Sequence, residues 1–474
     1  MLQKDISWEK FEQYNPDKTH SFENLCRLLF RHELCSDGTI LVSEPNHAGV
    51  EVKPVLSRDG KVISFQSKYF TGKVQYLQIK ESAEKAVKKY NKSLDIWYLY
   101  TNRSLSECFS YKEIVKILKD NGTEIKVVSN DEILTILLKY QFIMEVFFSV
   151  DNLPFSWFEN QVMSAVDDLG IRYNAAFNVE TEALDNMNLF LGNEDGVEFV
   201  NSKKSTVLKS IEEHCERLGH GDRANYDYIE AVYDLVSNLE DVDVINYQKA
   251  LSWYSYVNEK MNGAFDIDGQ IRAQQEENID KDSRKYLREL EWEKGITEDL
   301  IFTDDEVDLI NNKFVIVSGK AGMGKSQLLA MEALKNINNG YETILLLGEY
   351  FIEESSVSAQ IMSKLGLHYD IKKLFAIMEV YGQIKNRPIV VFIDAINECE
   401  YQKIWKNGVS ELYDLVKGYS FVRVVLSYRS GYEKKLFSDG MSSKMKSGEV
   451  ATIEHMGFSG RLIEAIKAFL TIMV

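Results

Sequence analysis

The chain has 474 residues, 45% of them apolar, which is enough to bury more than one hydrophobic core and to form about three domains. A net charge of −18 argues against a protein that binds nucleic acid over its whole surface, although residues 1–140 are nearly neutral and the acidic excess lies in the remainder. The five cysteines show no CxxC spacing, and the sequence has neither a signal peptide nor an apolar run of membrane-spanning length, so we expect reduced thiols, no zinc site and a cytoplasmic protein that does not contact a membrane.

Residues 1–145 predict a compact α/β domain, because helix and strand patterns alternate along them. Phe22, Leu25 and Leu29 share one face of a helix predicted at 21–34. Further on, short apolar or alternating runs bounded by turn residues predict strands at 39–44, 49–56, 61–70, 95–100 and 124–128, and apolar periodicity predicts helices at 76–90, 111–119 and 131–140.

Two of these strands bring three polar side chains together. Gln66 and Lys68 are two residues apart and so lie on one face of their strand, and Glu51 lies on the preceding strand. An acid and a lysine at adjacent strand ends suit hydrolysis of a phosphodiester, in which Glu51 binds Mg2+ and Lys68 positions or deprotonates the water. Glu23, on the first helix, is a further candidate metal ligand. The alternative is a plain hairpin with a surface lysine.

The Glu51…Gln66-Ser-Lys68 pattern, in this order of helix, strand, hairpin and helix, resembles the PD-(D/E)xK nucleases of the restriction-endonuclease-like fold, and it is most similar to the Mrr-type variant. The resemblance implies an endonuclease that cuts double-stranded DNA, with Glu51 and Gln66 as metal ligands and Lys68 as a catalytic residue. Glu51 stands where the family usually has Asp, which is a departure from its pattern.

Residues 146–295 predict a mainly helical linker domain. Helical patterns cover 200–218, 226–239, 245–262 and 271–292, and strand patterns are weak. The segment Arg172-Tyr-Asn-Ala-Ala-Phe-Asn178 is the least generic in this region, and its residues alone predict no role.

Residues 296–474 return to α/β alternation and predict a parallel sheet with crossover helices, from apolar strands at 314–317, 343–347, 389–394 and 422–427. The first strand is followed by a P-loop, Gly-x-x-x-x-Gly-Lys-Ser, and then by a helix. Backbone N–H groups of such a loop surround phosphate oxygens, the lysine reaches the β- and γ-phosphates, and the Ser hydroxyl takes a Mg2+ position. The alternative is a glycine-rich turn. The candidate nucleotide-binding residues are Gly319, Lys320, Ala321, Gly322, Met323, Gly324, Lys325, Ser326 and Gln327.

A second motif completes this nucleotide site. The buried strand 389–394 ends in Asp394, at the sheet edge where open α/β sheets bind ligands, and Asp394 is therefore a candidate Mg2+ ligand through water. Glu398, one turn on, is the candidate to orient the attacking water. The strand at 343–347 places the chain with ATPases whose acidic strand is not adjacent to the P-loop strand. Arg429 follows the fourth strand and is a candidate γ-phosphate sensor. The alternative for Asp394 is an acid that only caps the next helix, and the alternative for Arg429 is an ordinary surface arginine.

Together, the P-loop, Asp394-Ala-Ile-Asn-Glu398 and the Ser-Tyr-Arg429 strand end resemble the STAND class of signal-transducing NTPases, and are most similar to the antiviral STAND (AVAST) proteins. The stretches at 405–407 and 453–458 fit this likeness, whereas Asn397 stands where the family usually has Asp. The resemblance implies ATP and Mg2+ as cofactors and a homo-oligomer, expected as a tetramer. It also implies a viral (phage) protein as trigger, recognised by winged-helix and C-terminal sensor segments that the given sequence lacks.

The combined expectation is an α/β multidomain protein: a restriction-endonuclease-like domain, a helical spacer, and a P-loop (STAND/ASCE) NTPase domain. Its expected function is antiphage defence, in which ATP-dependent oligomerisation activates the nuclease. A different reading is a nucleotide-dependent scaffold whose N-terminal domain only binds nucleic acid or a partner. A third is an ATPase that translocates on DNA, which the absence of further helicase-type motifs disfavours.

Overall fold

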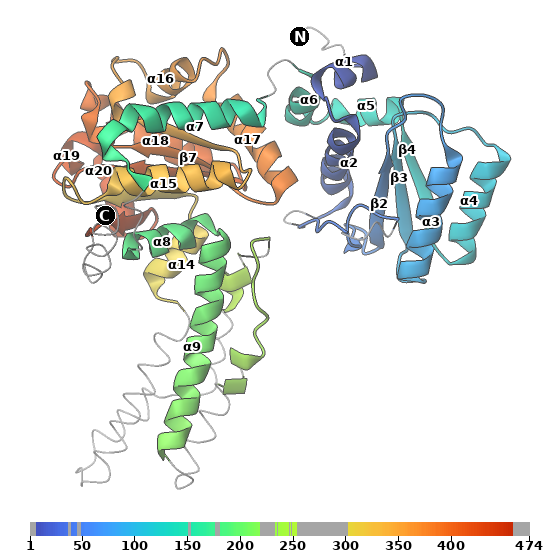
Figure 1. Cartoon of the computed structure of the whole chain (residues 1–474), viewed down its shortest axis with the longest axis horizontal. Helices are drawn as coiled ribbons and strands as arrows, with labels where there is room; N and C mark the ends of the chain where they lie inside the picture. The colour runs from blue at the N-terminus through green and yellow to red at the C-terminus, as the bar shows by residue number, and fades with distance from the viewer. Residues whose placement is uncertain are drawn as a thin grey trace, which may run out of the picture.

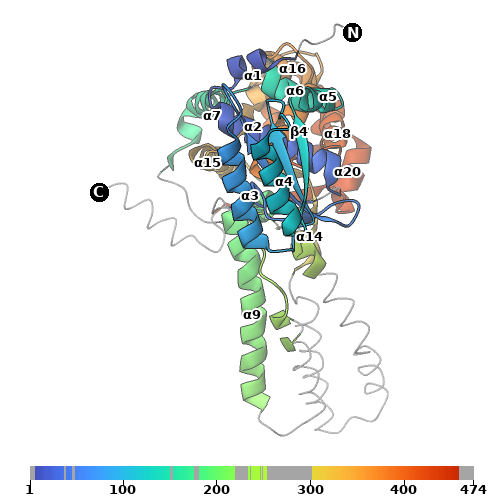
Figure 2. The same ribbon diagram turned by 90° about the vertical axis from the view of Figure 1, so that its right-hand side faces the viewer.

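The computed structural model describes residues 6–36, 39–44, 49–149, 153–175, 181–218, 233–234, 236–245, 247, 249–253 and 302–457. They form an N-terminal α/β unit, residues 6–149, and a C-terminal α/β unit built on a second sheet, which lie side by side in Figure 1. The long helix α9 (Glu194–Leu218) projects away from both units, as Figures 1 and 2 show.

The N-terminal sheet has the strand order β1-β2-β3-β4, with β1 antiparallel to β2 and the other neighbours parallel. Its strands are β1 (Val55–Leu56), β2 (Val62–Lys68), β3 (Ile96–Thr101) and β4 (Glu124–Ser129). The helices of this unit are α1 (Trp8–Tyr14), α2 (Lys18–Leu34), α3 (Tyr76–Tyr90), α4 (Phe109–Asp120), α5 (Asp131–Leu137) and α6 (Gln141–Phe148).

The two faces of this sheet bury different cores. Phe65 packs on Phe30 of α2, with ring centroids 4.9 Å apart, so the odd-numbered residues of β2 face α2. Trp97 and Leu99 of β3 pack with α3 and α4 on the opposite face. Because successive side chains of a strand alternate, Gln66 and Lys68 lie on the α3 side.

The prediction of a strand at 39–44 is wrong. Among the described residues, this segment forms β-pairing only at the isolated bridge between Ser43 and Val52. The strand predicted at 49–56 shrinks to β1, because Pro54 has no amide N–H to continue the ladder. The other predicted helices and strands of this unit are confirmed, with shifts of a few residues at their ends.

The C-terminal sheet has the order β6-β7-β8-β5-β9, and every neighbouring pair is parallel. Its strands are β5 (Phe314–Ser318), β6 (Thr343–Leu347), β7 (Ile389–Asp394), β8 (Val422–Ser427) and β9 (Ala451–Glu454). The acidic strand β7 is therefore separated from the P-loop strand β5, as predicted. The strand between them is β8, whereas β6 lies at the edge. A mixed α/β fold with parallel sheets is thus the observed fold class.

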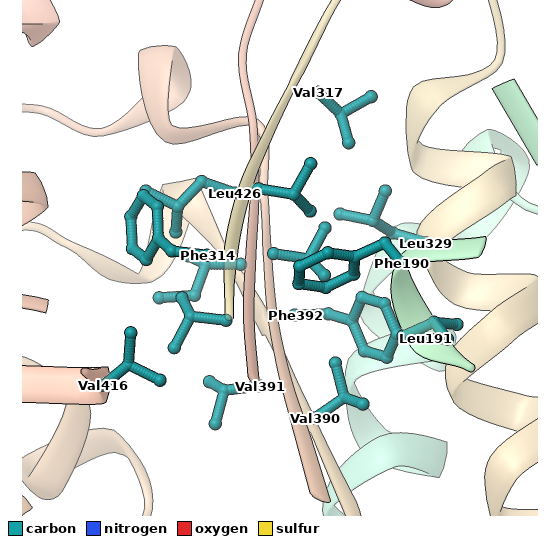
Figure 3. Packing of buried hydrophobic residues seen from close by; sticks show 14 of the residues in the cluster. Phe190, Leu191, Phe314, Val317, Leu329, Val390, Val391, Phe392, Val416 and Leu426 are labelled. Carbon is teal, nitrogen blue, oxygen red and sulfur yellow. The ribbon is translucent and has the colours of Figure 1, made fainter. Parts of the chain in front are cut away.

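Helices cover both faces of this sheet. One face packs against α7 (Phe155–Leu169), α8 (Glu182–Leu191) and α15 (Lys325–Asn338), and the other against α17 (Ile371–Lys385) and α18 (Trp405–Val416). Figure 3 shows Phe190, Leu191 and Leu329 on one side of the strands and Val416 on the other. The remaining elements are η1 (Gly170–Arg172), α14 (Asp304–Asn311), η4 (Gly348–Tyr350), α16 (Val357–Lys364), η5 (Ile396–Glu398), η6 (Gln402–Ile404), α19 (Glu433–Leu436) and α20 (Asp439–Lys446).

The region assigned to a helical linker contributes to this second unit. Its first helix, α7, packs on β6 and α15, and α8 packs near β9. The helix predicted at 200–218 is confirmed within α9. The helix predicted at 271–292 lies outside the described residues, as do large parts of those at 226–239 and 245–262.

Contacts between the two units centre on α17, which packs against α6 and α2. Ile377 and Val380 of α17 are buried in the same cluster as Phe147 of α6. Among the described helices, none combines the length and the apolar character that a membrane crossing requires. Cys26, Cys35 and Cys399 are buried free thiols, in line with the expected reduced state.

Candidate functional site

The P-loop is held between β5 and the N-terminus of α15. Helix α15 begins at Lys325, so the N–H groups of its first turn point towards the loop, where anions bind best. Gly319 is required by a close approach, because a Cβ there would lie 2.6 Å from the carbonyl oxygen of His455. In this structure Lys325 Nζ donates to the carbonyl oxygens of Gly319 and Lys320, at 2.8 and 2.9 Å.

Asp394 ends β7 at the carboxyl edge of the sheet and is almost fully buried. Its Oδ1 accepts a 2.5 Å hydrogen bond from Ser427 Oγ, and Oδ2 has no hydrogen-bond partner among the described residues. The next residue, Ala395, has φ 52°, a conformation that costs free energy in a non-glycine residue and is concentrated at functional sites. A buried carboxylate oxygen without a donor suits a hydrated Mg2+ ion.

A pocket of about 440 Å³ gathers most of the predicted residues. We call it the P-loop pocket. Its lining includes Ala321, Gly322, Gly324, Lys325, Ser326, Gln327, Asp394, Glu398 and Arg429. Gly319, Lys320 and Met323 belong to the loop but are not among the residues that line the cavity. The size is in the range of small-molecule sites.

The charges of the P-loop pocket act on one another. Burial lowers the pKa of Lys325, and the carboxylate of Asp394 opposes this shift. Burial raises the pKa of Glu398, which Arg172 opposes. Asn397 accepts a 2.8 Å hydrogen bond from the backbone N of Arg429 and so joins the ends of β7 and β8.

Arg172, for which the sequence predicted no role, also lines the pocket. Its Nη1 lies 2.8 Å from Glu398 Oε2 and its Nη2 lies 2.8 Å from Glu349 Oε1. Two residues on, the backbone N and O of Asn174 pair with the side-chain amide of Gln327, at 2.9 and 2.8 Å. The unusual composition of residues 172–178 was the only sign in the sequence that this segment has a specific role. The partners of Arg172 become evident only from the packing of α7 on the sheet.

His455 follows β9 and lies behind the P-loop. Its backbone N donates to Ser318 O at 2.8 Å, and its ring is buried close to Gly324. Burial, and then the positive charge of Lys325, lower the pKa of His455 to about 4. The ring is therefore neutral near pH 7 and supports the loop without adding a charge.

In the N-terminal unit the predicted trio is brought together. Glu51 Oε1 accepts hydrogen bonds from Gln66 Nε2 and, at 3.1 and 3.0 Å, from the backbone N and hydroxyl of Ser67. Burial and then the charge of Glu23 raise the pKa of Glu51. Burial lowers the pKa of Lys68, and the charge of Glu51 opposes this shift. A cation beside Glu51 would relieve the repulsion between the two acids.

Glu23 lies on α2, with Oε1 3.7 Å from Nη2 of the buried Arg27. It lines a second cavity, of about 660 Å³, between α2 and the C-terminal part of α17. In the part of the chain that the structure describes, no three His, Cys, Asp or Glu side chains form a group able to hold a metal ion. A Mg2+ ion at Glu51 would therefore take its other ligands from the Gln66 amide oxygen, water or a substrate.

Comparison of the sequence with known protein families gives no match, and comparison with curated proteins gives none either. Among solved structures, the chain is similar to the S. cerevisiae Hsp104-ADP complex, with 11% sequence identity over 87% of this chain and 73% of that chain. The TM-score of 0.20 is too low to support an argument about fold or function.

Proposed function

We propose that this protein is a STAND-class ATPase that controls an N-terminal, Mg2+-dependent DNA endonuclease. The observation that carries the first half is the convergence of Lys325, Asp394, Glu398 and Arg429 on one pocket at the carboxyl edge of a parallel sheet. These are the parts that phosphoryl transfer needs: a lysine for phosphate oxygens, an acid for Mg2+, an acid for water and an arginine for developing charge.

Ser326 and Asp394 would hold Mg2+, which when bound neutralises charge on the transferred phosphate. Glu398 orients the water, whose oxygen forms a bond to the γ-phosphorus as the bond to the bridging oxygen breaks. ADP leaves with that electron pair, and the proton of the water passes to the Glu398 carboxylate. Lys325 must leave the carbonyl oxygens of Gly319 and Lys320 to reach phosphate.

The second half of the proposal assigns hydrolysis of double-stranded DNA to Glu51, Gln66 and Lys68. Their convergence, the raised pKa of Glu51 and the lowered pKa of Lys68 support it. A lysine with a lowered pKa is better able to accept a proton from water. Glu23 acts through its charge on Glu51.

The biological setting that we propose is antiphage defence. A viral protein would be sensed by a C-terminal segment outside this sequence, and ATP binding would favour a homo-tetramer. Assembly would pair N-terminal units, so that both strands of one duplex meet an active site. ATP then serves as an assembly switch more than as a fuel.

The test combines DNA cleavage with metal removal. The assembled form of the purified chain, identified by size-exclusion chromatography with light scattering in the presence of ATP, should cut linear duplex DNA with Mg2+ and not with EDTA. Intact DNA under every Mg2+ condition, including those where the assembled form is present, would remove the nuclease from the proposal.

A second candidate is a nucleotide-dependent scaffold whose N-terminal unit binds nucleic acid or a partner without cutting it. The observation that favours it is that Oε1 of Glu51 already accepts hydrogen bonds from Gln66 and Ser67. DNA binding that is equal in Mg2+ and EDTA, with no cleavage, would support this alternative.

A further inference from the structure

Among the described residues that line the P-loop pocket, Arg172 is the charged one that the proposed reaction leaves without a role. Its guanidinium bridges two carboxylates, those of Glu398 and Glu349, with both N–O distances 2.8 Å. Glu398 is the acid proposed to orient the attacking water. The arginine therefore binds the group on which the chemistry depends.

The two carboxylates meet because two strand ends approach closely. Glu349 lies on η4, directly after β6, and Glu398 lies on η5, directly after β7. At Gly348 a Cβ would lie 2.0 Å from the carbonyl oxygen of Ala395, so only glycine permits this approach. The fold thus places two acids within reach of one guanidinium.

Arg172 is held at this position by α7. The side chain of Gln161 pairs with the backbone of Leu345 in β6, with Leu345 N 3.0 Å from Gln161 Oε1. Near the end of the same helix, the Tyr350 hydroxyl donates to Asp168 Oδ2 at 2.5 Å. Helix α7 is anchored to the sheet edge, and η1 carries Arg172 from its C-terminus into the pocket.

The pairing changes what Glu398 can do. A carboxylate oxygen that accepts from a guanidinium has less capacity to accept from water, and the positive charge makes the carboxylate a weaker base. Of the charges that act on Glu398, that of Arg172 has the largest effect and favours the ionised carboxylate. The charges of Asp394 and Glu349 have smaller effects and oppose ionisation.

We propose that Arg172 is a positioning residue that restrains Glu398, so that hydrolysis requires the guanidinium to release this carboxylate. The inference rests on the proposed ATPase function and adds its regulation. Helix α7, which positions Arg172, follows α6 of the N-terminal unit after a short connection. The restraint would therefore make ATP hydrolysis at the P-loop pocket sensitive to the position of α7 relative to the N-terminal unit.

The experiment compares the wild type with Arg172→Gln, Arg172→Lys and the pair Arg172→Gln with Glu398→Gln. ATP turnover is measured at saturating ATP, and affinity is measured separately with a fluorescent non-hydrolysable ATP analogue. We expect Arg172→Gln to raise turnover several-fold and leave affinity for the analogue within about twofold. The turnover of Arg172→Lys, which keeps the charge without bridging two acids, should lie between those of the wild type and Arg172→Gln. In the Glu398→Gln background the Arg172 substitution should have no effect on turnover.

Lys335→Gln is the control, because Lys335 lies in the last turn of α15, where it pairs with Asp195 of α9, and does not line the pocket. Unchanged or lower turnover in Arg172→Gln overturns the inference. A loss of analogue affinity of about tenfold or more also overturns it, because Arg172 would then be a phosphate ligand. A wild-type chain that binds no analogue overturns the proposed function itself, and the inference with it.

Discussion

Lys373 and Glu145 form an ion pair across the boundary between the two α/β units, with Nζ 2.9 Å from Oε2. Glu145 lies on α6 and is almost fully buried, and Lys373 lies on the first turn of α17. A buried carboxylate that loses its cation costs more than the pair contributes, since the remaining charge stays desolvated.

The first prediction concerns this pair. Lys373→Met should destabilise the contact between the units by roughly 3 kcal/mol, because the buried Glu145 carboxylate would lose this cation and stay desolvated. Urea unfolding measures the change. The double variant with Glu145→Leu should recover most of the loss; equal destabilisation of single and double variants would contradict this account.

The second prediction concerns the P-loop. Lys325→Ala should weaken binding of ATP by about tenfold to a hundredfold, because a charge-assisted contact to phosphate is lost, and it should block assembly and DNA cleavage together. Isothermal calorimetry with Mg2+ and a non-hydrolysable analogue checks affinity. Lys335→Ala, elsewhere on α15, is the matched control, and equal affinities for both variants would contradict the assignment.

The third prediction separates the two proposed sites. Lys68→Ala should abolish DNA cleavage and leave ATP affinity unchanged, because Lys68 lies in the N-terminal unit beside Glu51. Gel assays of duplex DNA together with analogue binding supply the two readouts. The matched control is Lys61→Ala, which changes an exposed lysine just before β2; this variant should cut DNA at the wild-type rate. Continued cutting by purified Lys68→Ala protein would show that the nuclease residues are wrongly assigned.

The fourth prediction concerns pH. Burial raises the pKa of Glu332 on α15 to about 7, and its Oε1 has no hydrogen-bond partner among the described residues. Between about pH 4.5 and 7 the folded chain keeps a proton that the unfolded chain has released, so stability falls as pH rises through this range. Glu332→Gln should remove that fall and stabilise the protein at pH 8 by at most roughly 3 kcal/mol.

Urea unfolding at pH 4 and pH 8 tests this pH dependence of stability, with the wild type and Glu332→Gln compared at each pH. The two proteins should be closer in stability at pH 4 than at pH 8, because at pH 4 Glu332 is protonated in the folded chain and mostly protonated in the unfolded chain. A stability difference that does not change with pH would show that Glu332 is not the titrating group.

The sequence predicted best where local signals agree. The run Ile389–Asp394 is fully buried on both faces of a parallel sheet, so its continuous apolar pattern identified the strand and its terminal acid. Glu51, Gln66 and Lys68 were brought together because the spacing of a hairpin fixes which side chains share a face. In both cases the chemistry follows from short-range geometry.

Tertiary packing decided what the sequence did not predict. Strand β9 spans only Ala451–Glu454, too short for a period-two pattern to be distinguished from a loop. Arg172 reaches its carboxylates only because α7 packs on β6, a contact between segments more than 170 residues apart in sequence. The predicted strand at 39–44 had suitable residues but lacked a continuous neighbour to pair with.

The position of α17 has a mechanical consequence. This helix is the crossover that leads from the β6 side of the sheet into β7, and residues 386–388 alone separate its end from the strand that terminates in Asp394. The helix against which the first unit packs is therefore joined, through three residues, to the strand that bears Asp394. We expect a substitution at the Lys373–Glu145 pair to alter nucleotide affinity if a shift of α17 displaces that strand, and to leave it unchanged if the helix moves independently of the strand.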